Sequence, residues 1–166
     1  HTLVIASKLF WPMSSDPNDR GLSRKHIVES ITRSLAALGT EYVDIYFCHR
    51  YDPETPLLET ARGMDDLIRQ GKVLYWGTSE WEPDQIVAVC DVCDRHGLHP
   101  PQVEQPEYSL LRRDRLERAL LPVTAPRGIG LTVYSPLAMG LLTGKYDDGI
   151  PVGSRFARED WSRSRV

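Results

Sequence analysis

Hydrophobic and polar positions along the chain fall into blocks, and five short apolar blocks predict β-strands. The blocks are residues 3–7, 43–50, 73–78, 101–104 and 129–134. Each is a few residues long and rich in branched or aromatic side chains, which is typical of a buried strand. A polar residue lies at or just beyond the end of each block, namely Lys8, His49, Ser79, Gln105 and Ser135. The blocks recur roughly every thirty residues, a spacing that indicates repeated βα units on a parallel sheet.

The segments between the blocks have the periodicity of amphipathic helices. In the first segment, Ile27, Ile31 and Leu35 recur every four residues and so share one helix face. Ser23 is a suitable N-cap, because its hydroxyl can accept a hydrogen bond from an early helical N–H. Gly39 is a suitable helix end. The sequence therefore predicts a helix between these two residues.

Proline positions predict the limits of two later helices. Thr55 and Pro56 are expected to be the N-cap and first residue of the second helix. A helix beginning near Asp114 should be short or kinked, because Pro122 and Pro126 lie inside it. The glycine-rich region from 136 to 155 predicts a long loop.

Alternating strands and helices allow either a doubly wound sheet or a (β/α)8 TIM barrel. No G-x-G-x-x-G motif follows the first block, which weakens the doubly wound, dinucleotide-binding interpretation. We therefore expect an α/β fold of the barrel type. A complete barrel needs about 250 residues, so about five of its βα units would be present here. The chain begins at His1 and ends in a polar, arginine-rich stretch, so we expect residues 1–166 to be one partial barrel domain from a longer protein.

Composition excludes several classes of protein. The chain is 41% hydrophobic and 26% charged with a net charge of −3, which is typical of soluble globular domains and not of nucleic-acid-binding proteins. No apolar run approaches the roughly 20 residues of a membrane span. The three cysteines favour a reducing, cytoplasmic compartment. Cys90 and Cys93 lie on the apolar face of a predicted helix and have no second pair, so we expect packing and no metal site.

Residue types alone leave the candidate chemistry open. A lysine at a strand end is ordinarily a solvated charge, and a lone histidine after a strand is ordinarily a hydrogen-bonded structural residue. Trp11 and Trp81 follow strand ends and could line a substrate pocket or anchor loops. Only the FCHR context (residues 47–50) together with the family resemblance described next favours functional roles for Lys8 and His49.

Long uninterrupted motifs resemble the aldo-keto reductase superfamily, in the branch that includes the potassium-channel β subunits and their bacterial relatives. They are SKLFW (7–11), GLSRKHIVESITRSLAALGTEYVDIYFCHR (21–50), DPETPLLET (52–60), IRQGKVLYWGTSEW (68–81), VEQPEYSLL (103–111) and YSPLAMGLLTGKYDDGIPVGSR (134–155). The resemblance covers nearly the whole chain. It implies a barrel, a nicotinamide cofactor and the reduction of carbonyl groups.

The resemblance also implies catalytic roles. Lys8 matches the family's lysine, which lowers the pKa of a proton-donating tyrosine, and His49 matches the histidine that orients the carbonyl. The tyrosine and an aspartate that pairs with the lysine precede the lysine in the family. No tyrosine precedes Lys8 here, so the chain is expected to carry half of the catalytic set.

Cofactor contacts follow from the same resemblance. Ser79 and Gln105 match positions that hold the nicotinamide carboxamide, and Tyr134 matches an aromatic ring that stacks on the nicotinamide. The loop that approaches the pyrophosphate is matched by Ser135, Pro136, Leu137, Ala138 and Met139. Lys145 and Arg155 match basic residues that close over the phosphates. The family also implies NADPH as the cofactor. Two departures are Glu80, where the channel subunits have a basic residue, and Gly153, which replaces an aromatic residue.

The expected function is the reduction of small aldehydes and ketones by NADPH in the cytoplasm, by a protein that could be a homo-oligomer. The alternative is a non-catalytic, cofactor-binding regulatory subunit of the channel type. The channel subunits have an amide at the position of His49, so the histidine favours the enzyme. The 166 residues alone are expected to be inactive, because the barrel would be incomplete.

Overall fold

The computed structural model describes residues 2–158, and these form one five-stranded sheet. All neighbouring strands are parallel and follow one another in sequence order. The strands are β1 (Ala6–Leu9), β2 (Val43–Cys48), β3 (Val73–Ser79), β4 (Val103–Gln105) and β5 (Gly130–Leu131). A doubly wound sheet reverses its strand order at a switch point, whereas consecutive neighbours are typical of a (β/α)8 barrel.

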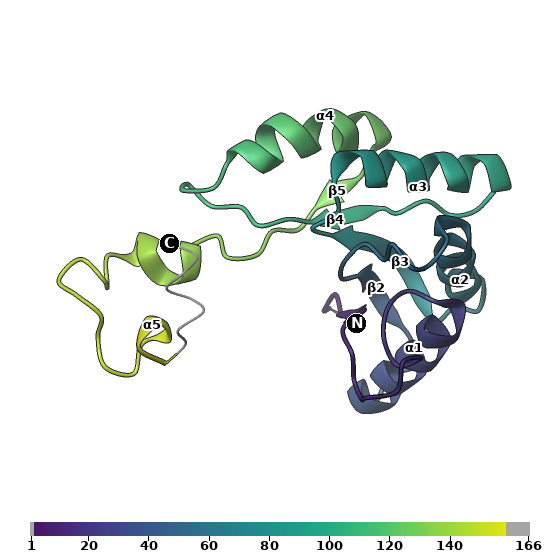
Figure 1. Ribbon diagram of the computed structural model, residues 1–166, viewed down its shortest axis with the longest axis horizontal. Helices are drawn as coiled ribbons and strands as arrows, with labels where there is room; N and C mark the ends of the chain where they lie inside the picture. Colours follow the sequence, from purple (N-terminus) through teal and green to yellow (C-terminus); the bar gives the residue numbers. More distant parts are fainter. Residues whose placement is uncertain (1, 159–166) are drawn as a thin grey trace.

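The helices cover one side of this sheet (Figure 1). They are α1 (Arg24–Leu38), α2 (Leu57–Arg69), α3 (Pro83–His96) and a π-helical turn (Arg115–Leu120) that continues into α4 (Leu121–Thr124) and a 3-10 turn (Ala125–Arg127). A second 3-10 turn (Ala138–Thr143) and α5 (Arg155–Arg158) follow β5 and lie away from the sheet. A doubly wound sheet is covered on both faces, while a barrel has its helices outside only. The one-sided helix layer therefore also favours the barrel.

The main core lies between the sheet and the helices. Tyr46 and Trp76 are paired in register on neighbouring strands and are fully buried against the helix layer. The next pair in register, Ile45 and Tyr75, points to the other face, where Tyr75 is 55% exposed. Successive strand residues point to opposite faces, so the two faces of the sheet differ in what covers them.

The first strand lies further along the chain than the sequence predicted. Strand β1 is Ala6–Leu9, not residues 3–7, so Lys8 lies within it. The backbone N–H of Ile5 donates to the side chain of Asp44 (2.7 Å), and the pairing with β2 begins one residue later. Leu3 therefore has no strand partner and is 74% exposed. Apolar character defined the block, but the register with β2 decided which part of it forms a strand.

Helix limits follow the predicted chemistry except at α2. Ser23 caps α1 by accepting from the N–H of His26, and Gly39 ends it with a left-handed φ of 64°. Thr55 was predicted as the N-cap of α2, and this is wrong: Pro56 holds that position. The Thr55 hydroxyl donates instead to Asp52 (2.8 Å). The helix after Asp114 is broken into π, α and 3-10 turns around its two prolines, as expected.

A methyl group added at Gly77 is expected to destabilise the β3–β4 pair. Its Cβ would lie 2.4 Å from both the backbone oxygen and the Cγ1 of Val103, and backbone cannot move aside. We expect Gly77→Ala to lower the free energy of unfolding by about 1–3 kcal/mol, measured by urea denaturation. Gly130→Ala is the matched control, since its nearest contact would be 3.6 Å. Equal stability of the two variants would contradict the prediction.

Candidate active site

Lys8 and His49 lie together at the carboxyl edge of β1 and β2. Lys8 is the third residue of β1, and His49 directly follows β2, where its N–H donates to the backbone oxygen of Leu9 (2.9 Å). Both residues line a small hollow of about 90 Å³, together with Trp11 and Met13. In a barrel the active site lies at this edge of the strands. The structure therefore brings the two predicted catalytic residues to one site.

Burial lowers the pKa of both groups. The pKa of His49 lies below its ordinary value, mainly because of burial and further because of the positive charges of Arg50 and Lys8. The imidazole is therefore neutral at neutral pH, with one nitrogen that donates a hydrogen bond and one that accepts. Burial likewise lowers the pKa of Lys8, whose ammonium lies 5.0 Å from the ring centre of Phe47.

The two tryptophans have different environments. The ring of Trp11 is 51% exposed and lies nearly perpendicular to His49, with 6.0 Å between ring centres. It can therefore border a substrate beside His49. Trp81 is fully buried and packs edge-on against Tyr51 at 5.1 Å. An enclosed ring offers no surface to a substrate, so the structure fits the loop-anchoring alternative for Trp81 and not the pocket.

A larger hollow of about 390 Å³ adjoins the first and shares Phe10 and Trp11 with it. All the residues that line it lie in the loops that follow β1 and β2. Buried Asp52 ties these loops together, because its carboxylate accepts from the N–H of Leu22 (2.7 Å) and from the hydroxyl of Thr55 (2.8 Å). The space beside Trp11 is therefore shaped by a fixed loop pair.

Ser79 and Gln105 are neighbours at the ends of β3 and β4. They are paired in register, and the Ser79 hydroxyl donates to the backbone oxygen of Gln105 (3.0 Å). The side-chain amide of Gln105 donates to the hydroxyl of Thr132 (3.1 Å), which fixes its direction. An amide has both a donor and an acceptor, so this pair has the chemistry that a primary carboxamide requires.

The remaining predicted cofactor residues lie where the chain leaves the sheet. Tyr134 still pairs with the segment after β4, through its N–H to the backbone oxygen of Pro106 (3.2 Å). The following residues include Ser135, Ala138 and Met139, which have left-handed φ values of 54°, 48° and 58°. Such conformations cost about 1–3 kcal/mol each in non-glycine residues and are frequent at ligand-binding loops.

Residues 136–158 form a lobe that extends away from the sheet (Figure 1). Pro136, Leu137, Lys145 and Arg155 lie in it, and the Lys145 ammonium is 5.0 Å from the ring centre of Tyr146. The structure therefore does not bring these predicted phosphate-binding residues next to Lys8 and His49.

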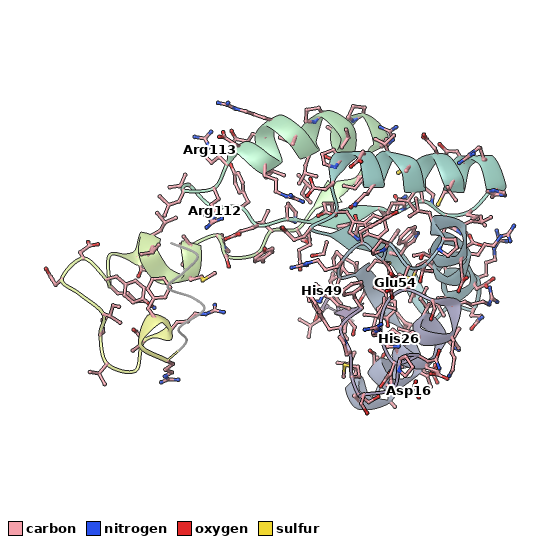
Figure 2. All side chains as sticks on the ribbon, in the orientation of Figure 1. Asp16, His26, His49, Glu54, Arg112 and Arg113 are labelled. Carbon is pink, nitrogen blue, oxygen red and sulfur yellow. The ribbon has the colours of Figure 1, made fainter. Side chains whose placement is uncertain are left out.

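His26 also belongs to the site, although the sequence did not predict it. His26 is fully buried in α1 and lines the same hollow as Lys8 and His49; Figure 2 labels both histidines. Its Nδ1 lies 3.5 Å from Asp19, and burial lowers the pKa of the imidazole. The available signal was its position beside Ile27 on the apolar face of the predicted helix.

Within residues 2–158, the structure contains neither a metal-binding cluster nor a membrane-spanning helix. Within this range, no group of three or more His, Cys, Asp or Glu side chains is arranged to hold a metal ion. Cys90 and Cys93 are buried in α3, and burial raises the pKa of the Cys93 thiol to about 12, so both side chains act as packing groups. None of the helices in this range is long and apolar enough to cross a membrane.

A comparison with known protein families agrees with the fold described above, a parallel sheet with a one-sided helix layer and polar strand ends. The model of the "Aldo/keto reductase family" matches residues 1–164. The chain belongs to the aldo/keto reductase family. Family membership confirms the (β/α)8 barrel that the sequence predicted, and the five-stranded sheet is consistent with part of one.

Similar proteins are named as channel subunits. The chain is 51% identical over 160 residues to a "Probable voltage-gated potassium channel subunit beta" of Arabidopsis thaliana and equally to one of Oryza sativa subsp. japonica. In each case the match covers 96% of this chain and 48% of the relative. A putative subunit of the same name from Schizosaccharomyces pombe is 46% identical over 155 residues, which are 93% of this chain and 45% of that protein. This aldo/keto reductase chain thus spans about half the length of the relatives that it matches.

Proposed function

We propose that the complete protein is a cytoplasmic oxidoreductase that reduces small aldehydes and ketones to alcohols with NADPH. The observation that carries this proposal is the convergence of Lys8 and His49 on one half-buried hollow at the carboxyl edge of the sheet. Bound NADPH supplies the hydride that reduces the carbonyl carbon. The protein must then orient the carbonyl and deliver a proton to its oxygen.

His49 and Lys8 would perform the polar part of this chemistry. The neutral imidazole of His49 can donate a hydrogen bond to the carbonyl oxygen and so fix its direction. The Lys8 ammonium stabilises negative charge that develops on that oxygen or on a proton-donating tyrosine. The family resemblance assigns this tyrosine to a segment that precedes Lys8. Trp11 would then cover the reacting group on the side of His49.

Three groups of residues would hold the cofactor. Ser79 and Gln105 present hydroxyl and amide groups suited to the nicotinamide carboxamide, and their side chains are already fixed by hydrogen bonds. The ring of Tyr134 would stack on the nicotinamide. The loop and the basic residues of the 136–158 lobe would hold the phosphates, since guanidinium and ammonium groups suit phosphate oxygens.

A direct assay of the complete, purified protein tests the proposed activity. Loss of NADPH absorbance is followed with 4-nitrobenzaldehyde as a reactive probe, and the same assay with NADH measures cofactor preference. We expect turnover that depends on the aldehyde and is faster with NADPH. NADPH binding without any turnover would reject the enzyme and leave the binding function.

The alternative is a non-catalytic, cofactor-binding subunit of a potassium channel. Similar proteins from three organisms are named as probable or putative voltage-gated potassium channel β subunits, which supports this alternative. His49 supports the enzyme, because an imidazole can take part in proton transfer and an amide cannot. The same assay separates the two functions, and size exclusion with light scattering of the complete protein shows whether it forms a homo-oligomer.

Removal of two basic residues in the 136–158 lobe should weaken NADPH binding. We expect the double variant Lys145→Ala/Arg155→Ala to raise the Kd by at least about tenfold with little change in kcat, because charge-assisted phosphate contacts contribute about 1.5–3 kcal/mol each. Fluorescence titration measures the Kd. Lys25→Ala/Arg118→Ala removes the same charge types from exposed helix positions and is the control. Unchanged affinity in the first variant would show that the lobe does not contact the phosphates.

A further inference from the structure

The carboxylate of Glu104 is buried beneath the ends of β3 and β4. Glu104 is the middle residue of β4 and is 0% exposed. One of its oxygens accepts from the hydroxyl of Thr78 (2.5 Å), and the other accepts from the backbone N–H of Glu80 (2.7 Å). Because neighbouring strand residues point to opposite faces, this carboxylate lies on the opposite face of β4 from the Gln105 side chain. Glu104 is thus hydrogen-bonded to both residues that flank Ser79, Thr78 and Glu80.

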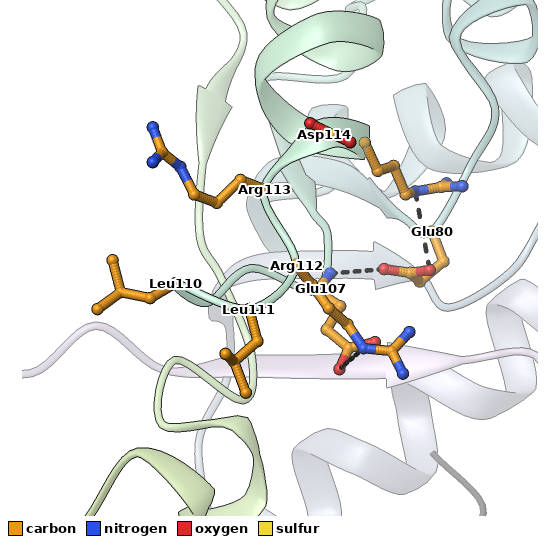
Figure 3. A pocket seen from close by; sticks show the side chains of 8 residues that line it. Glu80, Glu107, Leu110, Leu111, Arg112, Arg113 and Asp114 are labelled. Carbon is orange, nitrogen blue, oxygen red and sulfur yellow. Dashed lines mark hydrogen bonds and ion pairs between the residues drawn. The ribbon is translucent and has the colours of Figure 1, made fainter. Parts of the chain in front are cut away.

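The backbone that Glu104 holds has a strained conformation. Glu80 has a left-handed φ of 58°, which is unfavourable for a non-glycine residue and persists only where surrounding contacts fix it. The side chain of Glu80 in turn accepts from the N–H of Glu107 (2.6 Å), on the segment after Gln105. Figure 3 shows this contact. The guanidinium of Arg115 lies 3.9 Å from the same Glu80 carboxylate. The two glutamates therefore tie the turn after β3 to the turn after β4.

We propose that Glu104 is a positioning residue that holds Ser79 and Gln105 in the geometry that binds the cofactor's carboxamide. Glu104 contacts no cofactor itself and acts through Thr78 and the backbone of Glu80. This inference rests on the proposed function, because it assigns a use to the Ser79–Gln105 pair. The inference goes beyond the proposed function, because it makes the affinity for the cofactor depend on the charge of buried Glu104.

The charge of Glu104 is set by its surroundings. Burial raises its pKa to about 7, and the negative charge of Glu80 adds to this rise. Hydrogen bonds from Thr78 and from the Glu80 N–H oppose it, as does the positive charge of Arg115. Glu104 therefore changes its charge near neutral pH, well above the ordinary range of a glutamate.

Protonation weakens the tie between the strands. The carboxylate accepts from both Thr78 and Glu80, whereas the carboxylic acid must donate its own proton. If it donates to the Thr78 hydroxyl, the direction of that hydrogen bond is reversed. Both hydrogen bonds to Glu104 are then between neutral groups, and they are weaker than those that a carboxylate accepts. The tighter arrangement is thus present above pH 7 and is lost as the pH falls through 7.

The test is the NADPH affinity of the complete protein at pH 6, 7 and 8, measured by fluorescence titration. We expect the wild-type Kd to rise about three- to tenfold from pH 8 to pH 6, the effect of one weakened hydrogen bond. Glu104→Gln mimics the protonated form, so its Kd should be weak and nearly constant across this range. Its kcat at saturating NADPH should stay within about twofold of wild type.

Two further variants separate positioning from general damage. Glu107→Gln removes the charge of a second glutamate near Glu104. The Glu107 side chain lies 3.7 Å from Arg112 and is not fully buried, so the variant should keep the wild-type pH dependence of the Kd. Thr78→Val removes one partner of Glu104 and should weaken NADPH binding at pH 8 in the same direction as Glu104→Gln. Glu104→Gln should be at least as stable as wild type at pH 8, because it removes a buried charge.

The outcomes are distinguishable. A Glu104→Gln protein that matches wild type in both Kd and pH dependence overturns the positioning role and leaves the proposed function intact. A wild-type protein that fails to bind NADPH at every pH overturns the proposed function, and the positioning role falls with it. Loss of the pH dependence in Glu107→Gln as well would also overturn the assignment to Glu104.

Discussion

His49→Ala and Lys8→Met are each expected to lower the kcat of the complete protein by about 10²–10⁴-fold, the usual loss when a proton-transfer component is removed. Both side chains line the hollow at the strand edge, where the carbonyl would lie. Both side chains lie away from the 136–158 lobe, which is proposed to bind the phosphates. We therefore expect each variant to keep most of its affinity for NADPH. Steady-state kinetics with 4-nitrobenzaldehyde and fluorescence titration of NADPH measure the two quantities separately.

His99→Ala is a matched control for the histidine variant. His99 follows α3 and precedes β4, at the opposite end of the strands from His49, and its Nδ1 lies 2.6 Å from Asp65. Its loss should affect stability more than turnover. Near wild-type activity of a purified His49→Ala protein, or an equal loss in His99→Ala, would reject the catalytic assignment of His49.

The 166-residue chain expressed alone is expected to be catalytically silent and to aggregate or self-associate. Strands β1 and β5 are the two edges of the sheet, and edges with unpaired backbone groups readily pair with other chains. The face of the sheet away from the helices adds apolar surface, including Tyr75, which is 55% exposed. Half of the catalytic set implied by the family resemblance also precedes Lys8. Activity should therefore fall below detection.

Size exclusion with light scattering, followed by the NADPH assay, tests this prediction. The complete protein is the reference for both measurements. A stable monomer of the 166-residue chain that reduces 4-nitrobenzaldehyde would show that the open sheet is self-sufficient. It would also place the proton donor within these residues.

Local features of the structure were predictable because their chemistry depends on near neighbours in the sequence. The Ser23 cap and the Gly39 end of α1 are set by one side chain and one backbone conformation. The prolines at 122 and 126 break the fourth helix because proline lacks an N–H wherever it occurs. The expected order of strands and helices also follows from local periodicity.

Partners distant in the sequence could not be predicted in this way. Thr55 could cap a helix or bind Asp52, and only the folding of the loop onto Asp52 decided between them. Trp81 could have lined a pocket, but packing against Tyr51 in the fold encloses it. Such choices depend on which surfaces meet, and periodicity carries no information on that.

The sequence by itself determined that βα units would place Lys8, His49, Ser79 and Gln105 near the carboxyl ends of parallel strands, because strand periodicity and strand ends are local properties. Only the tertiary structure decided that Glu104 would be buried against Thr78 and Glu80, residues from a neighbouring strand and its turn. The register between β3 and β4 brings these groups together. Burial then makes a glutamate, ordinarily a solvated charge, into a group whose pKa is about 7.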